Sequence, residues 1–252
     1  MIDDLKNQPD LAYNSSSFQS NVFSEMSEIF KVKNNISVWQ RNLGNSLLES
    51  SKNILSSNPN LEFSKIVKPD NVEKTLSENI DSSKKSDYLF KDISKVVNMF
   101  CDLFSVDSAW LRLDAVYGPM CPRFHVDNVK CRLVTTYVGP ATQWLPNDIV
   151  DRSKLGHGNE GQSDEVSGLY LKESDVNQLA MGHIGLLKGE SWDGNKGSGL
   201  VHRSPQQEGE YKRLYMTIDF TDLYFKIFRN PGYPVSNILN SELKTKFEIT
   251  FN

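Results

Sequence analysis

The clearest pattern of apolar and polar positions along the chain is helical and lies between residues 87 and 104. Apolar side chains recur there at intervals of three or four residues, which is the repeat of one face of an α-helix. The segment DYLFKDISKVVNMFCDLF therefore predicts an amphipathic helix. The same repeat occurs earlier in the leucines at positions 43, 47, 48 and 55, which predict a second helix.

From Ala109 onward the repeat of apolar residues falls to two. Four runs rich in Val, Thr, Tyr and Leu alternate in this way and are bounded by Gly, Pro or Asn, as strands are. These runs are AWLRLDAVYG, CRLVTTYVG, LAMGHIGLLKG and RLYMTIDF. No convincing helix separates them, so the pattern favours an antiparallel double sheet over a βαβ unit. We expect an α+β fold, with a helical N-terminal part packed on a C-terminal double-stranded β-helix (jelly roll).

Three regions follow from this change of repeat. Residues 1–35 have no sustained repeat and include the linker-like YNSSSFQSN, so we expect a poorly ordered or peripheral segment. Residues 36–108 should form a mainly helical support region. Residues 109–252 should form the jelly-roll core that carries the chemistry.

Composition narrows the functional classes. The chain has 252 residues and a formal net charge of −4, and its basic residues are scattered, which argues against binding to nucleic acid. It has no apolar run of about 18 residues, so we expect no membrane span. The three cysteines, Cys101, Cys121 and Cys131, form no CxxC pair, and a reducing cytoplasm is the simplest location. The remaining partner is a small-molecule or peptide substrate, and the oligomeric state stays open.

The segment CPRFHVDNVKCRL holds the candidate chemistry. On a strand, His125 and Asp127 project to the same face, because alternate residues share a face. His202, in GLVHRSP, offers a third ligand. Two histidines and one carboxylate on one side of a metal, with the other side open, form the facial triad of non-haem Fe(II) oxygenases.

Arg213 follows His202 by eleven residues. Its guanidinium could bind the carboxylate of an acid co-substrate through two hydrogen bonds. Arg132 could serve the same carboxylate, although an ion pair is an equally good interpretation, and Tyr137 could line the pocket or belong to the core. The glycine-rich segment 185–199 would form a mobile lid or rim.

The arrangement HxD, a later His and a following Arg resembles the motif of the Fe(II)- and 2-oxoglutarate-dependent dioxygenases. The resemblance rests on His125, Asp127, His202 and Arg213. It implies a jelly roll that binds Fe(II) and 2-oxoglutarate and oxidises an organic substrate. The wider runs CPRFHVDNVKCRLVTTYVGPATQWLP and LLKGESWDGNKGSGLVHRSP also resemble an uncharacterised bacterial family of unknown function, over about residues 36 to 220.

Three alternatives stay open at the level of sequence. The same triad could hold Zn(II) in a non-catalytic, cupin-type metal-binding or metal-handling protein, because imidazole and carboxylate suit several divalent metals. Cys121, His125 and Cys131 could instead form a structural zinc site, although they lack the close CxxC pairing typical of one. If the triad does not converge, the chain is a β-sandwich interaction module without a metal.

Overall fold

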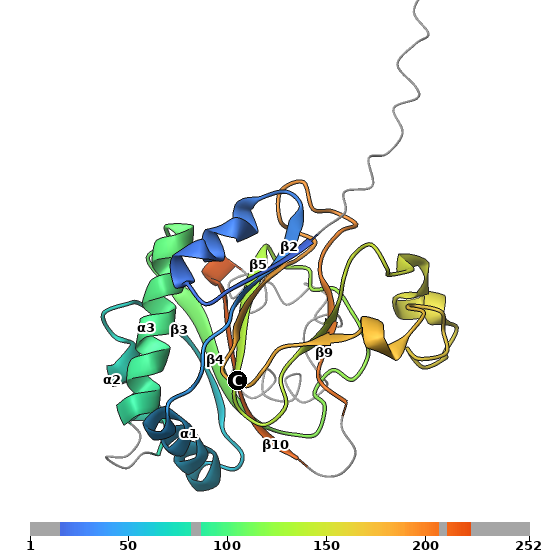
Figure 1. Cartoon of the computed structure of the whole chain (residues 1–252). Helices are drawn as coiled ribbons and strands as arrows, with labels where there is room; N and C mark the ends of the chain where they lie inside the picture. Colours follow the sequence, from blue (N-terminus) through green and yellow to red (C-terminus); the bar gives the residue numbers. More distant parts are fainter. Residues whose placement is uncertain (1–15, 82–86, 207–210, 223–252) are drawn as a thin grey trace, which may run out of the picture.

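The computed structural model describes residues 16–81, 87–206 and 211–222. These residues form a mixed structure of helices and two β-sheets (Figure 1). The N-terminal elements are β1 (Ser16–Ser20), the 3-10 helix η1 (Phe23–Phe30), β2 (Asn34–Trp39), α1 (Asn45–Ser57), β3 (Glu62–Val67), α2 (Val72–Asn79) and α3 (Asp87–Phe104). The later strands are β4 (Ala109–Tyr117), β5 (Cys131–Val138), β6 (Gln143–Leu145), β7 (Asn177–Gln178), β8 (Ile184–Lys188), β9 (Val201–Arg203) and β10 (Lys212–Phe220). Three short 3-10 helices lie before β7, at Arg152–Lys154, Gly156–Asn159 and Glu173–Asp175.

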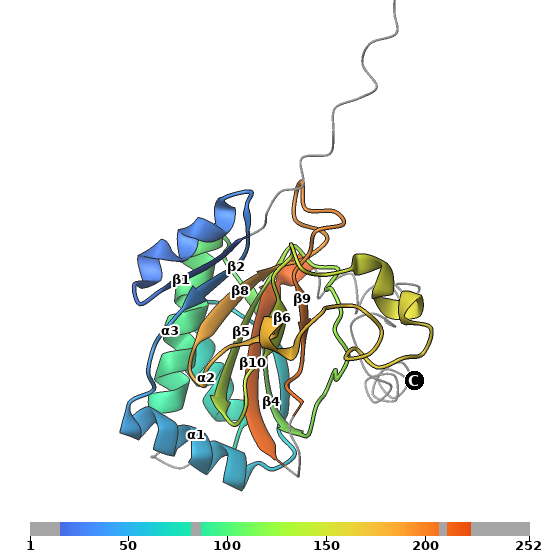
Figure 2. The ribbon, with the colours of Figure 1, turned by 45° about the vertical axis from the view of Figure 1, so that its right-hand side comes forward.

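The larger sheet has seven strands in the order β1-β2-β8-β5-β10-β4-β3. Its strand pairs are antiparallel except for β1 with β2. The smaller sheet has the order β7-β6-β9, and β6 and β9 lie in front of the larger sheet in Figure 2. β10 sits between β5 and β4, so residues far apart in the sequence meet on the inner face of the large sheet, the face turned toward the small sheet.

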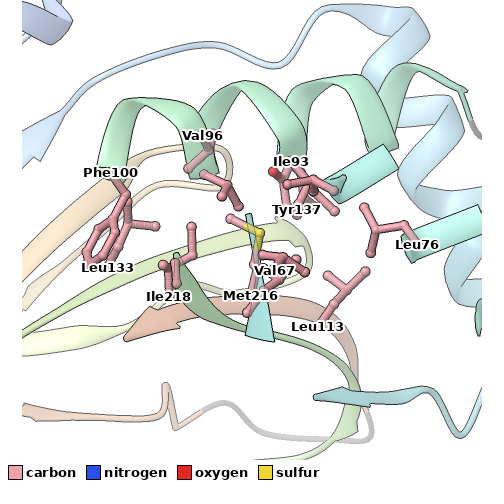
Figure 3. Packing of buried hydrophobic residues seen from close by; sticks show 14 of the residues in the cluster. Val67, Leu76, Ile93, Val96, Phe100, Leu113, Leu133, Tyr137, Met216 and Ile218 are labelled. Atoms are coloured by element: carbon pink, nitrogen blue, oxygen red, sulfur yellow. The ribbon is translucent and has the colours of Figure 1, made fainter. Parts of the chain in front are cut away.

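The outer face of the large sheet packs against α1, α2 and α3, which lie together on one side of it (Figure 1). The predicted repeat of α3 points Phe90, Ile93, Val97 and Phe100 into this core, all of them buried. Figure 3 shows the helix side chains above Leu133, Met216 and Ile218 of the sheet. The predicted helix 87–104 is confirmed at both of its ends.

Between the two sheets lies a second, smaller apolar cluster. It joins β2, β5 and β8 of the large sheet to β6 and the segment before β9. Its buried members are Ile36, Val38, Val134, Ala141, Trp144, Leu179, Leu187 and Leu200. The inner face of the large sheet is thus apolar along its β2–β8 side, and its polar residues gather on β5, β10 and β4.

The N-terminal part departs from expectation. Residues 16–35 are not peripheral, because β1 extends the large sheet and Met26 and Ile29 of η1 are fully buried in the main core. β2 and β3 also join the sheet, so residues 36–108 supply strands as well as helices. Residues 1–15 and 223–252, included in the predicted first and last regions, lie outside the described residues. In the described part of the chain, no helix is long and apolar enough to cross a membrane.

Candidate metal centre

The two candidate histidine ligands face each other across a single antiparallel bridge. The amide of each donates to the carbonyl of the other at 3.0 Å, and the ring centroids of His125 and His202 lie 4.6 Å apart. The neighbours Val126 and Val201 point the opposite way, into a third apolar cluster under the loop 146–176. His125 and Val126 therefore point to opposite sides, as the sequence predicted.

The hydrogen bonds of both rings prepare the same nitrogen for a metal. Nδ1 of His125 lies 3.0 Å from the carbonyl of Arg123, and Nδ1 of His202 lies 3.1 Å from the carbonyl of Leu200. Because a carbonyl oxygen can only accept, each Nδ1 must carry a hydrogen, and in the neutral ring this leaves the lone pair on Nε2. Partial burial and the neighbouring His202 lower the pKa of His125, which favours the neutral ring that binds metals.

Asp127 completes the cluster, but from a loop and not from the predicted strand. The loop is held by the backbone of residues 189–191, where the amide of Glu190 donates to the Asp127 carbonyl at 2.9 Å. Gly189 packs so closely on this loop that a Cβ there would lie 2.2 Å from the Val129 carbonyl oxygen. Residues 189–191 belong to the glycine-rich segment that was predicted to be a mobile lid or rim. They are hydrogen-bonded to the HxD loop and support it.

The three ligand atoms lie close to the spacing that one ion requires. Asp127 Oδ1 is 3.7 Å from His125 Nε2, and Oδ2 is 3.4 Å from His202 Nε2. All three ligand atoms lie within 4.8 Å of one another. Ligands about 2.1 Å from one ion and at right angles to each other are roughly 3 Å apart, so a small contraction would complete the site. The donor set fits a divalent metal.

Arg132 lies directly behind the carboxylate. Its Nη1 donates to Asp127 Oδ2 at 2.6 Å, and its Nε donates to Asp219 Oδ1 at 2.8 Å. Burial alone would raise the pKa of Asp127, but the Arg132 guanidinium and the two imidazoles outweigh burial and hold that pKa well below its usual range. Two of the three Arg132 nitrogens are therefore engaged by protein carboxylates, and Nη2 has no hydrogen-bond partner among the described residues.

Arg213 is a buried cation that meets no carboxylate among the described residues. Only 1% of it is exposed, and in the described part of the chain it forms no salt bridge, while its Nε lacks a hydrogen-bond partner. Its guanidinium lies 4.9 Å from the ring centroid of Tyr215, and burial lowers its pKa. At the end of β5 the backbone crowds it. A Cβ on Gly139, where φ is +89°, would lie 3.0 Å from Arg213 Cγ.

Tyr215 and Asp219 belong to this site and were not among the predicted site residues. They share the inner face of β10 with Arg213, since alternate residues point to the same side. Burial raises the pKa of Tyr215, despite the opposing effect of the nearby arginines 132, 213 and 112. The signal was present in RLYMTID, where polar residues alternate with Leu, Met and Ile.

Tyr137 lies apart from this site. Its side chain is fully buried in the main core below α3 (Figure 3), and its hydroxyl donates to Asp92 at 2.8 Å. The local reason is the regular alternation along β5, which puts Tyr137 on the same face as Cys131 and Leu133 of the main core. Tyr137 thus has the surroundings of a core residue, which was the alternative interpretation of this position.

The rival cysteine site does not assemble. Cys131 is fully buried in the helix-side core, whereas His125 points to the inner side with the other triad residues. All three cysteines are free. Among the described residues, the one group of three or more metal-type side chains is His125, Asp127 and His202.

The structure described so far is a mixed helix and sheet protein with a His-Asp-His centre suited to a divalent metal. A family model described as "Protein of unknown function (DUF1826)" matches residues 20–219, and the chain belongs to that family. No curated protein matches the chain.

Solved structures similar to the chain include 2-oxoglutarate and Fe(II) oxygenases. A protein of Shewanella oneidensis assigned as an oxygenase is 13% identical, with 86% of this chain and 98% of that one covered and a TM-score of 0.48. A prolyl-4-hydroxylase of Pseudomonas putida is 7% identical, with 79% and 99% covered and a TM-score of 0.43. A protein of Caulobacter crescentus assigned to the 2OG-Fe(II) oxygenase family is 9% identical, with 81% and 86% covered and a TM-score of 0.43. Because these scores lie below 0.5, the function has to come from the chain's own residues.

Proposed function

We propose that this protein is an Fe(II)- and 2-oxoglutarate-dependent oxygenase built on a double-stranded β-helix, acting on an organic substrate that is a small molecule or a peptide. The proposal rests on the presence of a convergent His-Asp-His cluster together with the buried cation Arg213, which forms no salt bridge among the described residues. A buried charge without a partner is costly, so its natural partner is an anion that the site binds.

In this proposal the metal is held by His125, Asp127 and His202 through two Nε2 atoms and one carboxylate oxygen. Bound Fe(II) would supply adjacent coordination positions for a 2-oxo acid and O2, and so couple decarboxylation of 2-oxoglutarate to oxidation of the substrate. The protein contributes the orientation of the ligands. Each imidazole is fixed by its Nδ1 hydrogen bond, and the two backbones hold each other.

The co-substrate is recognised by its far carboxylate. Arg213 would pair with that group, and the ring of Tyr215 keeps the guanidinium in place through a cation–π contact. Arg132, predicted to bind the co-substrate, retains one nitrogen for this role, because Nη1 and Nε serve Asp127 and Asp219. The apolar cluster between the sheets, which includes Trp144 beside His202, would exclude water from this end of the site.

Titration of the anaerobic Fe(II) protein with 2-oxoglutarate tests the proposal, followed by its absorption band or by calorimetry. We expect the wild type to bind, and Arg213→Ala to bind 2-oxoglutarate about ten- to a hundredfold more weakly, the scale of a lost charge-assisted pair. Arg213→Lys should recover part of the affinity, since an ammonium lacks the planar fork. Metal content should be the same in all three proteins. A wild type that binds no 2-oxoglutarate at millimolar concentration rules out the oxygenase.

A second candidate uses the same triad to hold Zn(II) in a non-catalytic metal-handling protein of the cupin type. Its support is the donor set itself, because two imidazoles and a carboxylate bind Zn(II) more tightly than Fe(II). Metal analysis of anaerobically purified protein separates the candidates. For either, the cytoplasm is the location that we propose, since three free cysteines stay reduced there.

A further inference from the structure

Four charged side chains of alternating sign run across the inner face of the large sheet and end at the candidate ligand Asp127. Arg112 of β4 donates from Nη2 to Asp219 Oδ2 at 2.9 Å. Asp219 of β10 accepts at Oδ1 from Arg132 of β5 at 2.8 Å, and Arg132 donates to Asp127 at 2.6 Å. The strands β5, β10 and β4 are neighbours in the sheet, so the four side chains form one continuous row.

This row is electrically balanced, and it is buried except for Arg112, whose side chain is 15% exposed. The side chain of Asp219 is 0% exposed, that of Arg132 is 9% exposed and that of Asp127 is 5% exposed. Buried ion pairs are a weak source of stability, because the loss of hydration offsets their attraction. Two guanidinium groups and two carboxylates also cancel, so the row offers no net charge to a ligand. Its effect on Asp127 is the more direct explanation for its presence.

Asp127 needs support that the two histidines do not. The rings of His125 and His202 are each held by an Nδ1 hydrogen bond to a backbone carbonyl, whereas the hydrogen bond from Glu190 holds only the backbone of Asp127 and not its carboxylate. Apart from the two imidazoles, Arg132 is the one side chain in the described part of the protein that contacts the Asp127 carboxylate. A carboxylate on a loop, without this contact, is free to rotate and to offer both oxygens to a metal.

We propose that Arg132 is a positioning residue of the metal centre and that Asp219, backed by Arg112, positions Arg132. By holding Oδ2, Arg132 fixes the plane of the Asp127 carboxylate and restricts Asp127 to binding the metal through one oxygen. A metal held by the triad would then have room for further ligands. The proposal depends on the metal site of the proposed function and is independent of 2-oxoglutarate.

Co(II) titration of the metal-free, full-length protein without 2-oxoglutarate tests this role. The absorption of bound Co(II) reports both its affinity and its coordination number. Arg132→Met should weaken Co(II) binding by about ten- to a hundredfold, as loss of a group that orients a ligand typically does, and should change the spectrum. Asp219→Asn, two contacts from the metal, should act in the same direction by a smaller factor.

The matched control is Asp92→Asn, which breaks the buried pair of Arg41 with Asp92, 2.7 Å apart, on the helix side of the sheet. It should lower stability and leave the Co(II) affinity and spectrum unchanged. Wild-type affinity and spectrum in both Arg132→Met and Asp219→Asn would overturn the proposal, as would an equal loss in Asp92→Asn. If Arg132→Met does not fold, Asp219→Asn, which keeps its shape and one acceptor oxygen, decides alone. A wild type that binds Co(II) but no 2-oxoglutarate would refute the oxygenase and leave this role standing.

Discussion

The two faces of the large sheet are built from the same strands and do opposite things. On β10, Leu214, Met216 and Ile218 point toward the helices and are fully buried among apolar side chains. The residues that alternate with them on β10 carry polar groups, and among these Arg213 and Asp219 are also almost fully buried. The helix-side face therefore buries apolar side chains, as protein cores usually do, whereas the inner face buries charged ones.

The difference shows where stability is given up for a site. Burial of each large apolar side chain on the helix face contributes about 1.5–3 kcal/mol to folding. On the inner face, the desolvation of buried charges offsets their attraction, and Arg213 forms no salt bridge with the described residues. A region that is expensive to bury and still fully buried is best explained by what it binds.

The largest effect is expected for His202→Ala. Removal of one of three protein ligands should reduce the bound metal from about one ion per chain to a trace, because the two remaining ligands hold a divalent ion weakly. Metal content after dialysis measures this. His183→Ala is the control, since this histidine lies outside the cluster. Full metal retention in His202→Ala would show that the metal sits elsewhere.

Two neighbouring residues of β10, Leu214 and Arg213, test the difference between the two faces. Leu214→Ala should lower the free energy of unfolding by about 2–5 kcal/mol, the cost of a cavity in a packed core. Its neighbour Arg213→Met should change this free energy by roughly 0 to +1 kcal/mol without ligand, because a buried cation that pairs with no described carboxylate is replaced by an apolar chain of similar length. Urea denaturation measures both.

The same pair sharpens the comparison when 2-oxoglutarate is added with Fe(II). The ligand should then stabilise the wild type and Leu214→Ala but not Arg213→Met, since binding to the folded state alone raises its stability. A large loss of stability in ligand-free Arg213→Met would mean that Arg213 stabilises the fold and that its role is not to bind an anionic ligand.

The smallest effect is expected for the cysteines. Replacement of Cys121 and Cys131 together by Ser should leave the metal stoichiometry unchanged, because neither thiol belongs to the cluster. It should cost some stability, since the Cys131 side chain is fully buried in the apolar core. Loss of metal in this variant, with metal retained in His202→Ala, would favour the zinc alternative.

Much of the site could be predicted because its parts are local patterns. The HxD motif and the later His202 can be recognised without the fold, although Asp127 reaches the cluster from a loop and not from a strand, and Arg213 stands out as a charge in an alternating strand. The amphipathic repeat of α3 defined that helix for the same reason. These patterns depend on the chain's own geometry over a few residues.

What could not be predicted depends on strands that are far apart in the sequence. Arg132 meets Asp219 because β5 and β10 are neighbours in the sheet, which no local pattern reveals. Tyr137 shares a face with Leu133, but the sequence alone does not show that this face of β5 is the one covered by the helices. The N-terminal strand β1 was missed because its partner, β2, fixes it by parallel pairing, and its own composition resembles a linker.

The backbone bridge between His125 and His202 affects which insertions the chain can accept during evolution. The bridge closes a long loop that contains β5 to β8 and the irregular segment 146–176. The entropy lost on closing a loop grows only with the logarithm of its length, so doubling it costs about 0.6 kcal/mol. Insertions in 146–176 can therefore change the surroundings of the metal centre at a small cost in chain entropy. The backbone bridge would still hold His125 and His202 opposite each other. A metal bound by both histidines would add a reversible cross-link between the two ends of this loop.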